Sequence, residues 1–359
     1  GAGAVDLGTV GTGLAGAATS INASTNSGGL TITYGSDTGT VTGSSGDDVV
    51  TTDSETISKA VDLGAGDDTY ILAAHSSGTT VTAALDGGDG TDTILLSSAA
   101  AAALDANSVF GDDLTSFEVL SLGAVGNVDI VTENLGLNSD IVIAGTSAAA
   151  TLSSLAANAK IEVTAAIVTS LTGALKTATG AADIINFSTN VDGNLSVGKI
   201  IVANVETVNF TAVDKVVDVT GATDAYGGNI ADGVDDTNSA QTVSFDIDEA
   251  TTLNLMGSAD LTVDLLDTNS SGADVKTSLV DASTMTGKLT FIADGLIAGT
   301  TVKGGTGADT LTADGSNDTL IGGAGADTIV TTTLTTATGG DGADTFVFET
   351  ATAITAFST

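Results

Sequence analysis

The chain of 359 residues contains no cysteine, no proline and no tryptophan, and aromatic residues make up only 3% of it. Without cysteine, disulfide bonds, thiolate metal sites and cysteine nucleophiles are all excluded. With so few aromatic side chains, the core must be built from Val, Ile, Leu, Ala and the methyl groups of Thr. These small, β-compatible side chains suit thin, repeated layers of strands.

Basic residues are equally scarce. Eight lysines and no arginine stand against 45 acidic residues, of which 38 are Asp, and the formal net charge is −37. This balance excludes a nucleic-acid-binding protein, which needs a basic surface, and disfavours docking on an anionic lipid surface by charge. The chain is nevertheless no disordered acidic tail, because 42% of its residues are hydrophobic and its mean hydropathy is +0.34.

Long hydrophobic runs are also missing. The longest, over residues 94–104, is interrupted by serines and is too short to span a bilayer, so we expect no direct membrane insertion. The sequence opens with Gly-Ala-Gly, without an initiator Met or a signal peptide, and we expect it to be a piece of a larger protein.

Internal repeats are the strongest signal in the sequence. The pattern Gly-Gly-x-Gly-x-Asp-x-U, where U is a large apolar residue, occurs complete at residues 87–94, 304–311, 322–329 and 339–346. At this Gly and Asp content about 0.03 chance matches are expected in the chain, so chance does not explain four. The pattern resembles the calcium-binding nonapeptide of RTX proteins.

Weaker copies surround the complete ones. Residues 63–70 lack only the first glycine, and residues 43–50 lack the second. Residues 313–320 keep Asp318 and Leu320 in phase without the glycines, and residues 178–185 keep only Asp183 and Ile185. The last of these is at best a decayed repeat.

Between the two arrays the nonapeptide pattern gives way to short alternating runs. Short runs alternate apolar and polar residues and predict strands with one buried face; they lie at 117–122, 205–210, 251–255, 261–265 and 288–291. Two Ala-rich stretches, 98–107 and 146–160, are either short helices or tightly packed coils where only Ala fits, and helix is favoured for the first.

The repeats, the alternating runs and the Ala-rich stretches together predict an all-β fold. We expect a calcium-binding parallel β-roll and β-helix solenoid with short Ala-rich helices. We divide the chain into an N-terminal β-roll-like segment with repeats (1–97), β-helix-like strand repeats (98–300), a C-terminal β-roll (301–350) and the start of a truncated or following segment (351–359).

The repeat supplies what a hard dication requires. Ca²⁺ takes about six to eight oxygen ligands, from carboxylates and backbone carbonyls. Glycines allow positive φ, so the turn can direct its carbonyls to a common centre, and Asp adds charge at short reach. The predicted calcium residues are the repeat acids Asp48, Asp68, Asp92, Asp309, Asp318, Asp327 and Asp344, the extra acids Asp47, Asp67, Asp86, Asp89 and Asp341, and the turn glycines Gly64, Gly66, Gly87, Gly88, Gly90, Gly304, Gly305, Gly307, Gly322, Gly323, Gly325, Gly339, Gly340 and Gly342.

The spacing of the repeats predicts how these residues stack. Two nonapeptides make one coil of 18 residues, so we expect Asp309 and Asp327 to share one ion, with Asp344 adjusted by one residue. Asp318 falls on the opposite edge, beside a glycine-poor turn, and is a weak candidate. Spacings of 20 and 24 residues in the first array require small insertions. Acids elsewhere, such as Asp235, Asp236, Asp246 and Asp248, are expected to be solvated turn residues.

The whole chain is similar to the lattice-forming surface-layer proteins of Caulobacter-type bacteria. The resemblance rests on the RTX repeats, on a Thr/Ala/Gly/Asp-rich composition without Cys, Pro or Arg, and on segments such as 280–290 that flank the repeats. It implies type I export, folding on extracellular calcium and lateral assembly of copies on the cell surface. Such proteins usually carry a polysaccharide- or membrane-anchoring domain, which is not identifiable in this chain.

Two other functions are compatible with calcium-binding repeats: an enzyme, and an adhesin or other exoprotein. An enzyme is disfavoured, because the single histidine, His75, has no metalloprotease motif around it and no Gly-x-Ser-x-Gly sequence occurs. An RTX adhesin or another calcium-stabilised exoprotein would share the solenoid and carry a ligand module. We therefore predict a structural protein that binds several Ca²⁺ ions, with copies of itself as partner, and no nucleic acid.

Overall fold

In the computed structural model, parallel strands coil into flattened solenoids. The structure describes residues 3–10, 19–35, 38–53, 56–72, 80–106, 110–126, 129–215, 239–247, 249–266, 276–294, 299–313, 317–331, 335–348 and 356–358. The chain divides into two compact units, Gly1–Ile161 and Glu162–Thr359, and the division falls within β17 (Lys160–Val163). The boundaries that we drew from sequence texture stay predictions.

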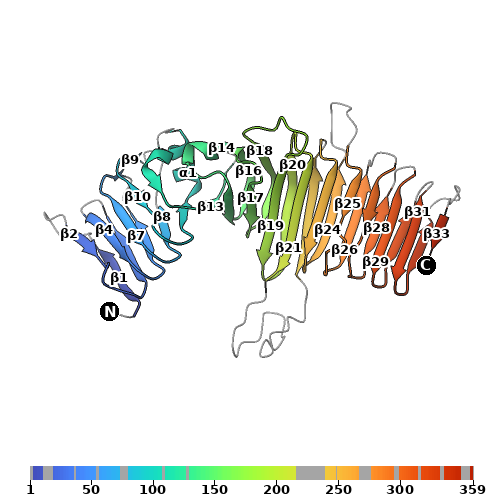
Figure 1. Ribbon diagram of the computed structural model, residues 1–359, viewed down its shortest axis with the longest axis horizontal. Coiled ribbons are helices and arrows are strands. Elements are labelled where there is room, and N and C mark those ends of the chain that lie inside the picture. The colour runs from blue at the N-terminus through green and yellow to red at the C-terminus, as the bar shows by residue number, and fades with distance from the viewer. Residues whose placement is uncertain are drawn as a thin grey trace. The chain divides into compact units, whose positions relative to one another are not determined.

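The first unit has two main layers of parallel strands (Figure 1). One sheet has the order β1 (Val5–Val10), β3 (Leu30–Tyr34), β5 (Val49–Thr52), β8 (Thr69–Leu72), β11 (Thr93–Leu96), β13 (Val119–Ala124) and β15 (Asp140–Gly145). The other has the order β2 (Thr19–Asn22), β4 (Thr38–Ser44), β7 (Val61–Gly64), β10 (Leu85–Asp86) and β12 (Leu114–Thr115). The pairs β6 (Thr56–Ile57) with β9 (Thr80–Val81) and β14 (Asp129–Val131) with β16 (Ser147–Leu155) complete it.

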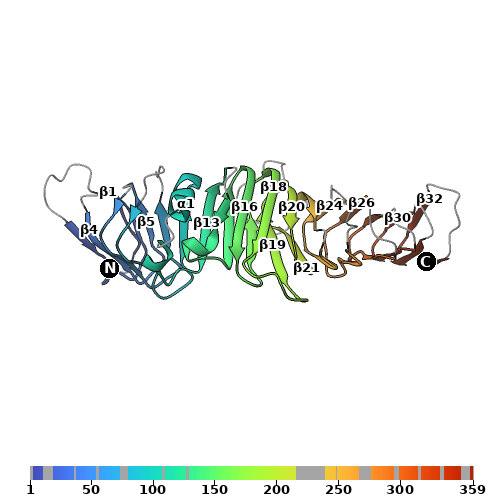
Figure 2. The ribbon, with the colours of Figure 1, turned by 90° about the horizontal axis from the view of Figure 1, so that it is seen from above.

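The second unit repeats this plan with longer strands (Figures 1 and 2). One sheet has the order β19 (Ile184–Val191), β21 (Thr207–Asp214), β23 (Thr252–Gly257), β25 (Leu279–Asp281), β27 (Thr301–Lys303), β29 (Thr319–Ala324), β31 (Thr336–Asp341) and β33 (Ala356–Ser358). The other has the order β18 (Ile167–Leu175), β20 (Leu195–Val202), β22 (Ala240–Asp246), β24 (Asp260–Leu266), β26 (Leu289–Asp294), β28 (Thr310–Ala313), β30 (Thr328–Thr331) and β32 (Thr345–Phe348). Successive strands fall in alternate sheets, so each coil adds one rung to both.

The core lies between the two sheets and is assembled from stacked rungs. Ile94, Leu120 and Ile141 are equivalent residues of neighbouring strands, and each is at most 1% exposed. In the second unit the rings of Phe210 and Phe245 meet edge to face across the core, with centroids 5.6 Å apart. All five predicted alternating runs overlap strands, and the predicted parallel β-solenoid is confirmed.

The two Ala-rich stretches behave differently. The first forms helix α1 (Ser98–Asp105), where the Ser97 side chain accepts a hydrogen bond from the amide of Ala100 and caps the helix. Asn107 lies outside the described residues. Short 3-10 helices follow at η1 (Phe110–Asp113) and η2 (Thr132–Leu135).

For the second Ala-rich stretch the helical alternative is wrong. It forms β16 and leads into β17, with Ala150, Leu152 and Leu155 facing the core. The neighbouring strand β14 offers an unpaired edge, and pairing with it outweighs the helix propensity of Ala.

The close approach of successive turns makes a prediction for glycine substitutions. Gly323 has a φ of +110°, and a Cβ atom there would collide with the carbonyl of Gly305 in the adjacent turn. Gly299 has a φ of +89°, but a Cβ atom there would meet no atom within 4 Å. We expect Gly299→Ala to cost about 1–2 kcal/mol of backbone strain, and Gly323→Ala to cost clearly more, in urea unfolding with calcium present. Equal losses would show that the turns do not stack this tightly.

Candidate calcium sites

A column of buried carboxylates runs along the first unit. Asp48, Asp68 and Asp92 stand directly before β5, β8 and β11, and each is at most 1% exposed. The Oδ1 atom of each accepts a hydrogen bond from the backbone N–H at the same position in the preceding coil. Leu30 donates to Asp48 over 2.7 Å, Asp48 to Asp68 over 2.7 Å, and Asp68 to Asp92 over 2.8 Å. The acids of the weak repeats are therefore in phase with the acid of the complete repeat.

The second unit contains the same column on the sheet of β28, β30 and β32. Leu289 donates its N–H to Asp309 over 2.8 Å, Asp309 to Asp327 over 2.8 Å, and Asp327 to Asp344 over 3.1 Å. Thr310 pairs with Thr328 and Thr328 with Thr345. The predicted coils of 18 and then 17 residues are thus the coils that the structure has.

Asp318 lies on the other edge of the coil, as its spacing predicts. It precedes β29 in the opposite sheet, is fully buried, and accepts hydrogen bonds from the amides of Gly299 (3.1 Å) and Thr300 (2.9 Å). It therefore stands apart from the column of Asp309, Asp327 and Asp344.

The second carboxylate oxygen points to a metal ion. The Oδ2 atoms of Asp68, Asp92 and Asp327 are buried, and no hydrogen-bond donor among the described residues reaches them. A buried, unsatisfied carboxylate oxygen is costly, and a bound cation removes the cost. The Oδ2 atom of Asp309, by contrast, accepts a hydrogen bond from the amide of Gly305 (2.7 Å).

The glycines keep the space beside these oxygens open. A Cβ atom at the first glycine of a repeat would collide with the Oδ2 atom of the repeat's own Asp; this holds for Gly87, Gly304, Gly322 and Gly339. In three of the four repeats the later glycines have positive φ, as at Gly88 (+105°) and Gly90 (+145°), and these two lie against the carbonyls of Gly64 and Gly66 in the preceding turn. Gly305 and Gly307 of the remaining repeat do not have positive φ. The turns thus combine a carboxylate oxygen with columns of backbone carbonyls, the ligand mixture that Ca²⁺ prefers.

Side chains alone do not form these sites. Over the part of the chain that the structure describes, no group of three or more His, Cys, Asp or Glu side chains could hold a metal ion. Each coil contributes one acid to the column, so backbone carbonyls must supply most of the coordination. The sharing of one ion by Asp309 and Asp327 stays a prediction.

Burial shifts the protonation of these acids. Desolvation, reinforced by the neighbouring acids Asp48 and Asp92, raises the pKa of Asp68 to about 7. Desolvation also raises the pKa of Asp309 to about 6, and it raises the pKa values of Asp92 and Asp327. Without a cation these four acids hold a proton more readily than an exposed Asp does, so Ca²⁺ binding competes with protonation as the pH falls.

The extra acids of the two arrays divide into three groups. Asp47 and Asp67 are exposed and form a second ladder, in which Asp47 accepts the N–H of Asp67 (3.0 Å) and Asp67 that of Thr91 (2.9 Å). Asp86 lies in β10, and its buried Oδ1 atom has no hydrogen-bond partner among the described residues, which keeps it a candidate ligand. The side chains of Asp89 and Asp341 are exposed, and their backbone carbonyls accept hydrogen bonds from Gly66 and Gly325.

Two glutamates continue the pattern where the nonapeptide is absent. Glu118 accepts the N–H of Asp92 (2.8 Å), and Glu206 accepts that of Asp183 (2.9 Å). Sequence reasoning missed both. A signal was available, because each is an acid near the start of an alternating run, and in the structure each directly precedes a strand, as Asp does in the repeat.

Acids expected to be unconnected with calcium show a mixed outcome. The Asp246 carboxylate forms an ion pair with Lys199 at 2.9 Å and is partly buried, so it is no solvated turn residue. Asp183 accepts the amide of Gly180 at 3.0 Å. His75, Asp235, Asp236 and Asp248 lie outside the described residues.

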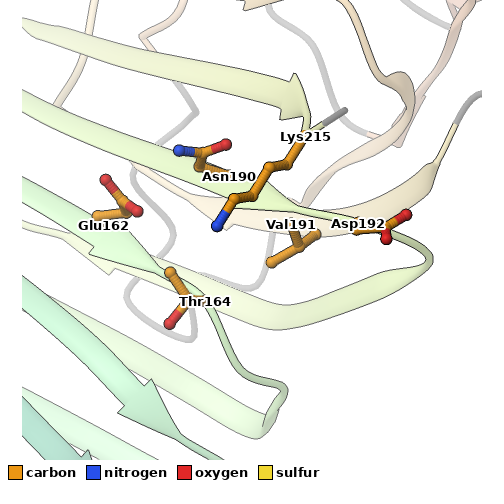
Figure 3. Close-up of a pocket in the computed structure, with 6 residues that line it drawn as sticks. All are labelled: Glu162, Thr164, Asn190, Val191, Asp192 and Lys215. Carbon is orange, nitrogen blue, oxygen red and sulfur yellow. The ribbon is translucent and has the colours of Figure 1, made fainter. Parts of the chain in front are cut away.

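A polar cavity of about 430 Å³ opens in the second unit, where β17, β19 and β21 end. In Figure 3 the Lys215 side chain extends towards Glu162 and Thr164, whereas Asp192 lies on the far side of Val191. Asn190 completes the lining. The cavity offers both charges and an amide to a small polar ligand.

The fold and the acid columns define a parallel β-solenoid with calcium-binding turns. Comparison with protein families agrees: the model of the RTX calcium-binding nonapeptide repeat, in four copies, matches residues 295–329. That segment contains Asp309, Asp318 and Asp327. These repeats bind Ca²⁺ and are typical of secreted proteins, which supports an extracellular calcium-binding protein. A search of curated proteins found no match. Among the described residues, no helix has the length and apolarity needed to cross a membrane.

If Asp68 is a calcium ligand, the substitution Asp68→Asn should shift the unfolding temperature in opposite directions with and without calcium. In Asp68→Asn the remaining oxygen can still accept the Asp48 amide, but the anion is lost. With calcium we expect a lower unfolding temperature than wild type, because an ion loses a ligand. Without calcium at pH 8 we expect a higher one, because the wild-type carboxyl, with its raised pKa, favours the fold when protonated and loses that contribution as pH rises through about 7.

Asp62→Asn is the matched control, because Asp62 is an exposed acid on the neighbouring strand β7. We expect it to change neither unfolding temperature by more than about 1 °C, since isolated surface changes have small effects. If Asp68→Asn lowered the unfolding temperature equally with and without calcium, the carboxylate would be structural and no ligand.

Proposed function

We propose that this protein is a calcium-dependent structural protein of the bacterial cell surface, which folds on extracellular Ca²⁺ and self-assembles into a two-dimensional surface layer. The observation that carries the calcium step is the column of buried Asp carboxylates, in which the Oδ2 atoms of Asp68, Asp92 and Asp327 have no hydrogen-bond donor among the described residues. A chain of net charge −37 repels itself, and divalent cations relieve that repulsion at the turns. We therefore expect the calcium-free chain to be expanded and only weakly folded, and calcium to compact it.

The lattice step follows from rigidity and resemblance. Calcium fixes the turns, the turns fix the stack of coils, and a rigid stack presents the same edges and faces to every neighbouring copy. The composition and the flanking segments resemble surface-layer proteins. The protein does no catalysis in this account. Cell-surface polysaccharide is a further partner, held through a region outside this chain.

The second candidate function is an RTX adhesin or another calcium-stabilised exoprotein. The observation that favours it is the polar cavity lined by Glu162, Asn190 and Lys215, which has the size and polarity for a sugar or another small polar ligand. An adhesin would use calcium in the same way, but would stay monomeric and bind its ligand through such a site.

Sedimentation velocity separates the two functions. Protein stripped with EGTA is compared before and after the addition of millimolar calcium. For a surface-layer protein we expect compaction followed by very large particles that EGTA dissolves, and electron microscopy of those particles gives regular sheets. Compaction that stops at the monomer favours the adhesin, and no response to calcium contradicts both.

A further inference from the structure

The outer face of one sheet in the second unit carries a continuous column of threonines. Register pairs link the strands β22, β24, β26, β28, β30 and β32 one after another, and they place in one row Thr242, Thr262, Thr290, Thr310, Thr328 and Thr345. Phe291, Leu311 and Ile329, the next residues of three of these strands, are fully buried. The threonines therefore point outward, spaced by roughly 4.8 Å from strand to strand.

A second outward column runs beside the first. Over β26, β28, β30 and β32 it consists of Ile292, Thr312, Val330 and Val347. Ile292 is 40% exposed and Val347 39%. We call the two columns over these four strands the threonine face. It carries no charge, and Asp264 of β24, the register neighbour of Ile292, marks its border.

The opposite sheet of the same coils also has an outward row of threonines, Thr301, Thr319 and Thr336, but the row beside it contains charged residues. An ion pair between Lys303 and Asp281 (2.8 Å) crosses it. In the described part of the second unit, every exposed large apolar side chain belongs to a strand of the sheet with the threonine face; these side chains are Val168, Ile292, Val347 and Phe348. The two sheets of one solenoid thus differ in exposed apolar side chains and in charge.

We propose that the threonine face is a docking surface for a second copy of this chain, a proposal that rests on the self-assembly proposed above. Two copies that each carry a net charge of −37 repel one another, and contact through their acidic turns would be unfavourable. The threonine face lets two copies meet without opposing acids. A copy also brings the same strand spacing, so the outward rows of two copies match rung for rung when the sheets pack about 10 Å apart.

The area and the residue types of the threonine face are those expected for a weak, repeated contact with a second copy of the chain. Four strands span roughly 14 Å, so the face is smaller than the ~800 Å² per partner of a stable dimer interface. A single contact is therefore weak, and repetition across an assembly makes it effective. The face offers no lysine to a nucleic acid or an anionic lipid, and none of its residues has an aromatic ring on which a sugar could stack.

The test adds two charges to the face. The face variant combines Thr312→Glu with Val330→Glu, which are register neighbours on β28 and β30 in the second column of the threonine face. The matched control, Thr338→Glu with Ile321→Glu, alters register neighbours on the outer surface of the opposite sheet in the same coils. Circular dichroism with calcium confirms that both variants fold. Sedimentation velocity with calcium is then expected to show loss of the large particles for the face variant and wild-type particles for the control.

The outcomes separate this proposal from self-assembly itself. If wild type and the face variant both form large particles, the docking surface is refuted and self-assembly stands. If wild type stays monomeric in calcium, self-assembly fails, and the docking surface fails with it.

A second measurement decides the case in which added charge blocks both variants or prevents folding. Because the chain has no cysteine, Val330→Cys and Ile321→Cys each carry a single thiol. Assembly is expected to slow maleimide labelling at position 330 at least about tenfold and to leave position 321 unchanged, since only the former is covered. Unchanged labelling at position 330 in assembled protein overturns the proposal.

Discussion

The burial of one carboxylate per coil is the constraint on which this structure depends. Asp68, Asp92 and Asp327 are enclosed, and hydrogen bonds from the described residues satisfy only one of the two oxygens of each. Leaving such groups charged and uncompensated is among the most unfavourable arrangements available to a protein interior. A cation shared with backbone carbonyls removes that cost, so the same residues that destabilise the calcium-free chain hold the coils together once calcium is bound.

This arrangement separates charge from contact surface. The nonapeptide acids sit in turns at the edges of the coils, while the two outward columns over β26, β28, β30 and β32 are uncharged and consist of β-branched residues. Calcium therefore acts where the coils turn, and the flat faces remain free for packing. Self-assembly as proposed would therefore not require the acidic turns of two copies to face each other.

Much of the site was predictable from sequence because the repeat couples chemistry to geometry. An acid followed by an alternating apolar run places Asp309 and Asp327 in one column, and the 18-residue coil follows from their spacing. Glu118 and Glu206 escaped prediction because their turns lack the glycines that make the repeat visible. For residues 146–160 the sequence left a helix and a packed coil both open, because Ala propensity is local, whereas the pairing of β16 with β14 is a tertiary effect. The ion pair of Asp246 with Lys199 joins residues 47 positions apart, beyond any local pattern.

Hydrogen exchange at the amides of the column tests the central claim most directly. The N–H groups of Asp48, Asp68, Asp309 and Asp327 donate to the carboxylate of the following coil. If calcium compensates those carboxylates, exchange measured by mass spectrometry with and without the ion should slow strongly in peptides from both arrays when calcium is added. Equal protection of these peptides in the two states would contradict the account, because the columns would then be stable without the cation.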